Sequence, residues 1–250
     1  MLSAATVVFD LGSEITEEIP MGFTGFPEDT RVFLRELTAN NQRDWFEANK
    51  KRYEQVGKAP LSDLCLAVAD MGAREELDIS GDPKRSPFRI YRDVRFSKDK
   101  SPYKTHLSAF FGPNGDKNEL GGVYFHVEPE RCLLAAGLYA ADNKMLTAIR
   151  GWIVAHPKKF LAMRDDLAAK GLELESWDSL KRVPPAFAEH KESSIAPYLM
   201  WKQFMVSRTL PPDTIESPTL IDSIEAMARD CQGFRRWTKE FAAYSAGRRG

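Results

Sequence analysis

The residues best suited to chemistry form a run of cations between positions 89 and 104. Six cations, Arg92 included, lie there against two carboxylates, Asp93 and Asp99, which leaves a local excess of four positive charges. Guanidinium groups make paired hydrogen bonds to phosphate and carboxylate groups, and lysine side chains add mobile positive charge. The run therefore predicts a site for a small phosphorylated or carboxylated ligand. The cations expected to bind it are Arg89, Arg95, Lys98, Lys100 and Lys104.

An internal ion-pair network is the alternative use of the same residues. Charged runs usually form solvated faces or pair with one another, and residues 97–104 lack the glycines of a phosphate-cradling loop. The chain is therefore expected to be a binding module or enzyme for a small anionic ligand, or else a non-enzymatic protein that contacts an acidic partner. A concave pocket favours the first function and a flat basic surface favours the second. The sequence selects no reaction type and no cofactor.

Arg92 is expected to have a structural role. Side chains alternate between the two faces of a strand, so in a strand Arg92 shares the face of the apolar Ile90 and Val94. Burying an unpaired charge is costly. We therefore expect Arg92 to be buried in an ion pair with Asp44 or Glu47.

An asparagine-rich block precedes the basic run, at residues 40–49. Asn41 is expected to cap a helix, and Trp45 is expected to anchor that helix in the core. The same helix carries Asn49 and Tyr53, whose amide and phenol groups can supply polar contacts to a ligand. These two residues complete the candidate ligand site.

Histidine chemistry is a weaker possibility. If a hairpin closes near Asp116, His106 and His126 lie at nearby cross-strand positions, with Glu128 on the same face as His126. Two histidines and a carboxylate can bind zinc or iron, but exposed strand histidines are commoner, and we expect no metal. The sequence also has no nucleophile elbow, local cysteine–histidine motif or dinucleotide-binding glycine motif.

The elements that position these residues change in type along the chain. Helical spacing of apolar residues predicts three helices between positions 27 and 77, and helices return after Asp142. The middle of the chain alternates, and its short turns indicate antiparallel pairing. This order predicts an α+β fold, with a central antiparallel sheet flanked by N-terminal and C-terminal helices. Strands are expected at residues 88–96, 106–111, 122–128, 132–139 and 202–210.

Composition limits the partners and the compartment. The 250 residues carry 35 Lys and Arg against 36 Asp and Glu, so no global field draws the chain to nucleic acid or a membrane. Residues 1–22 are expected to form a poorly ordered extension before a single α+β domain over residues 23–245. Cys65, Cys132 and Cys231 lack paired spacing, which predicts buried thiols in a reducing compartment. No apolar run is long enough to span a bilayer, and we expect a cytoplasmic protein.

Two long motifs carry a resemblance to a known family. Residues 40–49 read NNQRDWFEAN and residues 92–104 read RDVRFSKDKSPYK; shorter blocks lie at residues 180–184 and 201–204. Over nearly all of residues 26–241, the chain resembles the family catalogued as domain of unknown function 2461. The resemblance implies a shared fold and brings no reaction, cofactor or catalytic residue with it. We call residues 40–49 the first motif and residues 92–104 the second motif.

Overall fold

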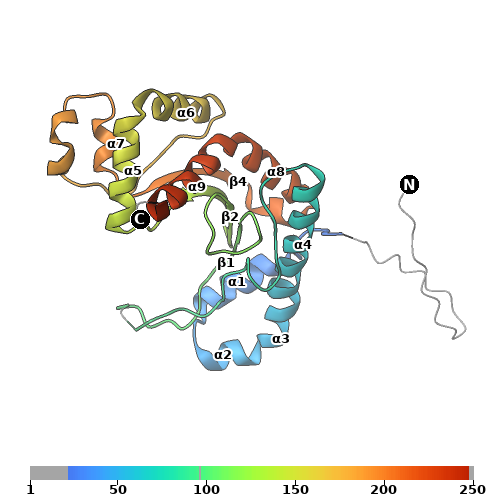
Figure 1. Ribbon diagram of the computed structural model, residues 1–250. Coiled ribbons are helices and arrows are strands. Elements are labelled where there is room, and N and C mark those ends of the chain that lie inside the picture. Colours follow the sequence, from blue (N-terminus) through green and yellow to red (C-terminus); the bar gives the residue numbers. More distant parts are fainter. Residues whose placement is uncertain (1–21, 96, 248–250) are drawn as a thin grey trace, which may run out of the picture.

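The computed structural model describes residues 22–95 and 97–247 of the chain. In the described residues, helices flank one four-stranded antiparallel sheet (Figure 1). The predicted α+β fold is confirmed. The expected N-terminal extension, residues 1–22, lies outside the described residues except for Gly22. No helix in the described part of the chain is long and apolar enough to cross a bilayer.

Helices come first, the sheet follows, and helices flank its last strand. Before the sheet lie α1 (Asp29–Ala39), α2 (Arg43–Ala48), α3 (Lys50–Tyr53), a π-helical turn (Glu54–Lys58) and α4 (Ala59–Arg74). The strands are β1 (Leu107–Phe111), β2 (Val123–Glu128), β3 (Arg131–Leu138) and β4 (Phe204–Leu210). Between β3 and β4 lie α5 (Asn143–Ala155), α6 (Pro157–Ala169), a 3-10 turn (Pro185–His190) and α7 (Ala196–Met200). After β4 come a second 3-10 turn (Pro212–Glu216), α8 (Leu220–Asp230) and α9 (Gln232–Gly247).

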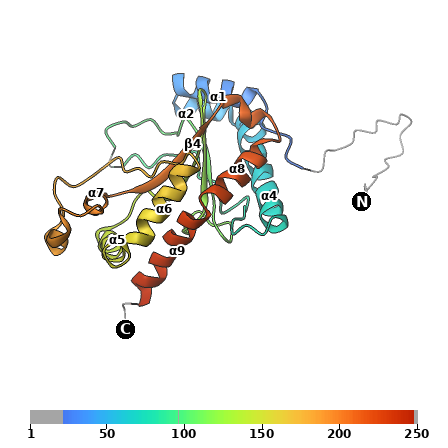
Figure 2. The same ribbon diagram turned by 90° about the horizontal axis from the view of Figure 1, so that it is seen from above.

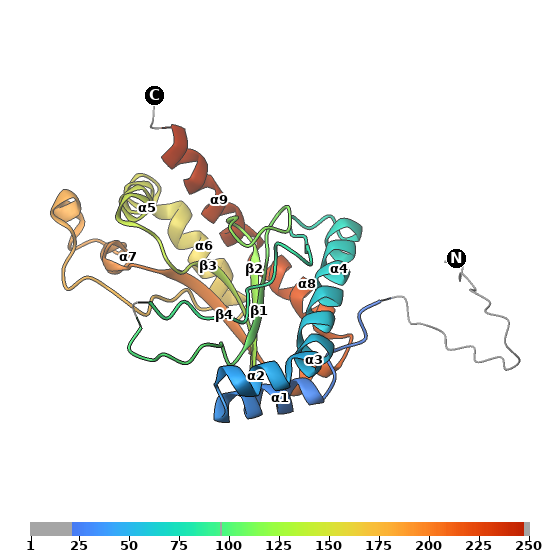
Figure 3. The same cartoon turned by 90° about the horizontal axis from the view of Figure 1, so that it is seen from below.

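The two faces of the sheet differ in polarity along β2. Its strands run in the order β1-β2-β3-β4, all antiparallel. Along β2, Val123, Phe125 and Val127 are fully buried, and the residues that alternate with them are partly exposed. Helices α4 and α8 cover the apolar face; Figures 2 and 3 show them on one side of the sheet and the extended segment that precedes β1 on the other. The polar side chains of β2 therefore point away from the main core.

The strand expected at residues 88–96 is wrong for the described residues of that range. Residues 90–104 instead form an irregular hairpin, which we call the arm, and Phe96 within it lies outside the described residues. The N–H of Arg92 donates to the carbonyl of Pro102 at 2.9 Å. Pro102 has no N–H to return the bond, so the pairing stays at isolated bridges. The other four predicted strands are confirmed as β1 to β4, within two residues at each end.

A proline lies inside the long helical run that ends with α4. Pro60 lacks the N–H that would bond the carbonyl of Val56, four residues earlier. The hydroxyl of Thr30, fully buried on α1, donates to that carbonyl at 2.5 Å. The π-helical turn just before Pro60 and this hydrogen bond together let the helix continue, and they tie α1 to the start of α4.

Candidate functional site

The two sequence motifs meet at the base of the arm. The side-chain amide of Asn41 donates to the carbonyl of Tyr103 at 2.9 Å, and the N–H of Tyr103 donates to Asn41 Oδ1 at 3.1 Å. The expected capping role of Asn41 is wrong, since Gln42 occupies the N-cap position of α2 and makes no side-chain cap bond. The side-chain amide of Asn41 instead pairs with the backbone of Tyr103, as a neighbouring strand would. These two hydrogen bonds hold the arm against the turn between α1 and α2.

Aromatic stacking strengthens this junction. The ring of Phe46, on α2, stacks on the ring of Tyr103 with centroids 4.0 Å apart, and Tyr91 packs against Tyr103 at 5.4 Å. Phe46 and Tyr103 are buried, whereas Tyr91 is 46% exposed. The arm is thus fixed at its base by one asparagine and a buried aromatic pair.

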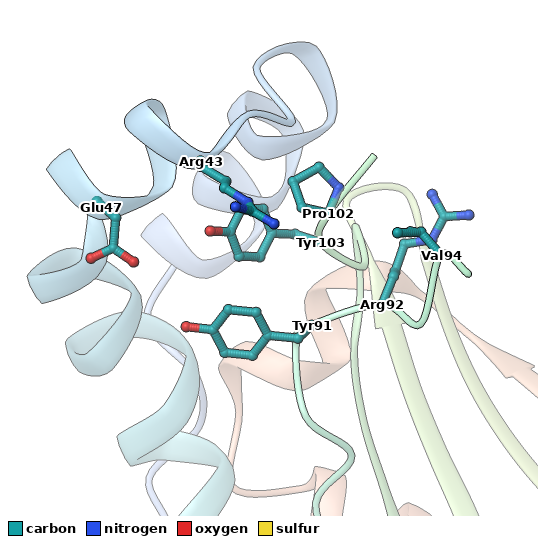
Figure 4. A pocket seen from close by; sticks show the side chains of 7 residues that line it. All are labelled: Arg43, Glu47, Tyr91, Arg92, Val94, Pro102 and Tyr103. Atoms are coloured by element: carbon teal, nitrogen blue, oxygen red, sulfur yellow. The ribbon is translucent and has the colours of Figure 1, made fainter. Parts of the chain in front are cut away.

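A first cavity of about 300 Å³ lies between α2 and the arm. Figure 4 shows the Tyr91 hydroxyl on the side of Glu47, the side chain of Arg43 beside Tyr103, and the guanidinium of Arg92 directed away from Glu47. The wall combines two tyrosine rings with two arginines and one carboxylate. Its lining residues are Arg43, Glu47, Tyr91, Arg92, Val94, Pro102 and Tyr103.

A second cavity of about 370 Å³ lies at the base of the arm, next to the last turn of α1 and to Asn41 in the turn that follows. It is more polar than the first and shares Arg92 and Tyr103 with it. Both motifs contribute to its wall. The lining residues are Thr38, Asn41, Arg92, Asp99, Ser101, Tyr103, Lys104, Thr105 and His106.

The predicted ion pair of Arg92 with Asp44 or Glu47 is wrong. Arg92 pairs with Asp99, seven residues further along the same arm, and Ser101 donates to the other oxygen of Asp99 from its hydroxyl at 2.6 Å. These hydrogen bonds hold the pKa of Asp99 well below its usual range. Arg92 is also partly exposed rather than buried, because the arm leaves the sheet before the apolar alternation can enclose it.

Of the other cations in the arm, three lie away from the cavities and one, Lys104, lines the second cavity. Arg95, at 77% side-chain exposure, pairs with Asp93 at 2.7 Å, and the ammonium of Lys100 donates to the carbonyl of Val94 at 3.0 Å. Lys98 is exposed. None of the three basic side chains lines either cavity. The structure therefore does not bring Arg95, Lys98 and Lys100 to the cavity that Lys104 lines.

Lys104 is the second cation, beside Arg92, that lines the second cavity. Its ammonium lies 5.3 Å from the ring centre of Phe88. Burial, and then the nearby charge of Arg89, lower the pKa of Lys104. In the described part of the chain no carboxylate lies within ion-pairing distance of Lys104 or of the exposed Arg89. Arg89 does not line the cavity, and its charge helps to lower the pKa of Asp93, so Lys104 is the lining cation without an ion-pair partner among the described residues.

Asn49 and Tyr53 have structural surroundings. Asn49 donates to the carbonyl of Trp45, one helical turn earlier, at 2.9 Å. The ring of Tyr53 packs against Phe33 and Phe46, and burial raises the pKa of its hydroxyl to about 12. Neither residue lines the two cavities.

The strand register brings two histidines and a carboxylate together beside the second cavity. Ser108 pairs with His126, so His106 lies diagonally across from His126 with ring centroids 4.3 Å apart. His126 Nε2 is 2.9 Å from Glu128 Oε1, and its Nδ1 is 3.0 Å from the hydroxyl of Tyr124. Burial and the neighbouring His126 lower the pKa of His106 to about 4, and burial lowers that of His126. Both rings are therefore neutral at physiological pH.

Several lining residues escaped the sequence reasoning. Ser101 lies inside the second motif, so its spacing from Asp99 could have indicated a polar turn. Thr38 and Thr105 gave no signal, because their place at the cavity depends on how the arm folds back over the end of α1. The expected pairing of Arg92 with Asp44 or Glu47 was the one sequence prediction that brought the two motifs together.

Comparisons with other proteins identify the family. Residues 29–237 match the family described as "Conserved hypothetical protein (DUF2461)", and the chain belongs to it. No curated protein matches the chain. One similar solved structure is that of an uncharacterized protein from Methanothermobacter thermautotrophicus, with 12% sequence identity and a TM-score of 0.33, covering 73% of this chain and 99% of that one.

Proposed function

We propose that this chain, a member of the DUF2461 family, binds a small phosphorylated or carboxylated molecule in the second cavity, with Lys104 as its principal cation. One observation carries the proposal: the two motifs, far apart in sequence, meet around this polar cavity of about 370 Å³. Small-molecule sites are usually concave and enclose roughly 300 to 1,000 Å³.

The charges at the cavity support an anionic ligand. Lys104 has lost part of its hydration, lies near the charge of Arg89, and has no ion-paired carboxylate among the described residues. An anion bound to Lys104 in the cavity would offset this repulsion and replace the lost hydration. The hydroxyl of Thr105, on the same wall, can donate a further hydrogen bond.

Arg92 can also bind the ligand if the ligand displaces Asp99 from its ion pair with Arg92. Its guanidinium lines both cavities and already holds Asp99 in an exposed ion pair. Exposed pairs of this kind contribute little to stability. A phosphate group can therefore replace Asp99 at small cost, and Arg92 would then provide the paired hydrogen bonds that such groups favour.

Titration calorimetry against sugar phosphates, nucleotides and dicarboxylates tests the proposal. At least one compound is expected to bind with a Kd below millimolar, and more weakly as salt is added. Lys104→Gln should weaken that binding by about 1.5 to 3 kcal/mol, the contribution of a charge-assisted hydrogen bond, or roughly 10- to 150-fold. Lys159→Gln, the same change on α6, is the control for net charge and should leave binding unchanged.

The exposed cations of the arm support a second function, contact with an acidic protein. Arg95, Lys98 and Lys100 are exposed on the arm and do not line the cavities. If Lys98→Gln weakens anion binding as much as Lys104→Gln does, or if no compound binds below millimolar, the cavity proposal fails and this second function takes its place. Melting curves of each variant show whether the fold is intact.

A further inference from the structure

We propose that His106, His126 and Glu128 bind a divalent transition metal ion of the class of Zn²⁺ or Fe²⁺ at the wall of the second cavity. Each residue offers one donor atom, and the three atoms lie within 4.8 Å of one another. Metal–nitrogen bonds of about 2.1 Å place the donors of a tetrahedral ion roughly 3.4 Å apart. This spacing lies between the 2.9 Å that separates His126 Nε2 from Glu128 Oε1 and the 4.8 Å within which all three donors lie.

The second shell of His126 is already in place. Its Nδ1 lies 3.0 Å from the Tyr124 hydroxyl, and this contact holds the ring with Nε2 facing Glu128 at 2.9 Å. In metal sites the ring nitrogen that does not bind the ion is usually held by such a partner. The side chain of His126 is 12% exposed, so the ring has little freedom to turn away.

His106 supplies the donor that distinguishes this group from an ordinary histidine–glutamate contact. Among the described residues it makes no hydrogen bond, so its ring nitrogens are available to an ion. A simple pair occurs elsewhere in the chain, where His190 Nε2 lies 3.2 Å from Glu189 Oε1, and that pair has no third donor. The β1–β2 register thus builds a nitrogen–nitrogen–oxygen set from two strands.

Such a set suits a reactive rather than a purely structural ion. Three protein ligands leave at least one coordination position open, and two histidines with one carboxylate match zinc and non-haem iron. His106 lines the second cavity, as Lys104 does, so the ion would lie at the cavity wall. An anion in the cavity could then occupy the open position, a step that rests on the proposed function.

Calorimetric titration of chelator-treated, full-length protein with ZnCl₂, in the absence of any phosphate or carboxylate, tests the site. One ion per chain should bind with micromolar or tighter Kd. His106→Ala and Glu128→Gln should each weaken binding by about 100-fold, and Tyr124→Phe, which removes a second-shell contact, by about 10-fold. His190→Ala should bind zinc as the wild type does.

Two results would overturn the inference: no saturable zinc binding, or the same loss for His106→Ala and His190→Ala. His106→Ala removes no hydrogen bond, so it carries the test even if Glu128→Gln misfolds. The Co²⁺ form adds an absorption spectrum that reports coordination directly. With the anion titrations also run on chelator-treated protein, and with no anion in the metal titration, either proposal can fail while the other stands.

Discussion

Arg92 and Lys104 belong to one motif but have different surroundings. Arg92 pairs with Asp99, whose side chain is 60% exposed, whereas Lys104 is partly buried against Phe88 and has no ion-paired carboxylate in the part of the chain that the structure describes. An exposed ion pair stabilises a fold weakly because water and salt screen it. A cation that has lost hydration without gaining a partner is better suited to bind a ligand.

This difference predicts a small effect of Arg92→Met on stability. The free energy of unfolding, measured in urea, should fall by less than about 1 kcal/mol. A buried pair would instead cost about 3 to 5 kcal/mol on removal of one partner. A loss of that size would contradict the exposed Arg92–Asp99 pair and restore a structural role for Arg92.

The three cysteines allow a second prediction at this scale. All are free and buried, as the sequence predicted, and burial raises the pKa of Cys65, Cys132 and Cys231 to about 12. Because the thiolate is the reactive form, a thiol reagent at pH 8 should modify none of them in the native protein. All three should react once the chain is unfolded in guanidinium. Rapid reaction of one native thiol would show that its segment opens.

At the scale of residues, the sequence predicted which side chains lie close together only where regular secondary structure determines their positions. The sequence predicted that His106, His126 and Glu128 lie close together, from strand alternation and one hairpin. The register of β1 and β2 confirms this prediction. The partner of Arg92 could not be found in this way. It depends on an irregular arm that turns Asp99 back toward Arg92, for which the alternation of side chains gives no rule.

At the scale of elements, one glycine fixes how β3 lies against β4. Gly137 has φ of +131°, and a Cβ there would lie 2.1 Å from the carbonyl oxygen of Phe204 on β4. Only glycine fits this backbone without strain. The close approach of the two strands therefore depends on the missing side chain.

Two glycine-to-alanine variants should consequently change stability in opposite directions. Gly137→Ala should destabilise the fold by about 2 to 4 kcal/mol through strain and overpacking. Gly151→Ala, within α5 where a Cβ meets no atom within 4 Å, should stabilise it by about 0.5 to 1 kcal/mol. Urea unfolding measures both. Equal effects of the two changes would contradict the β3–β4 packing described above.

The elements themselves could largely be predicted from patterns of apolar residues. The helix expected to begin after Asp142 does so, with the Asp142 side chain accepting from the N–H of Met145 at 2.7 Å. The strand expected at residues 88–96 failed, because Pro102 on the opposite side of the arm cannot complete a ladder. The alternation of apolar and polar residues in one segment does not show whether the neighbouring segment can form backbone hydrogen bonds with it.

At the scale of the whole molecule, the described core begins at Phe23. Phe23 and Phe26 are buried, and the N–H of Phe26 donates to the carbonyl of Ile215 at 2.7 Å. Deleting residues 1–20 should leave the melting temperature within a few degrees of the full chain, because their sequence is acidic and lacks a sustained apolar periodicity. A large drop would mean that the removed segment docks on the domain.

The central claim is that a small anion binds in the cavity between the two motifs, and the histidine rings can report it. His106 lines that cavity, while His156 contacts Trp152 on α5 and His190 lies in the 3-10 turn Pro185–His190. Adding pyrophosphate to chelated, ¹⁵N-histidine-labelled protein should shift the NMR signals of the His106 ring to saturation and leave those of His156 and His190 in place. The shift should disappear in Lys104→Gln. If no ring responds, or if His190 responds as strongly as His106, the anion does not bind in this cavity and the account is contradicted.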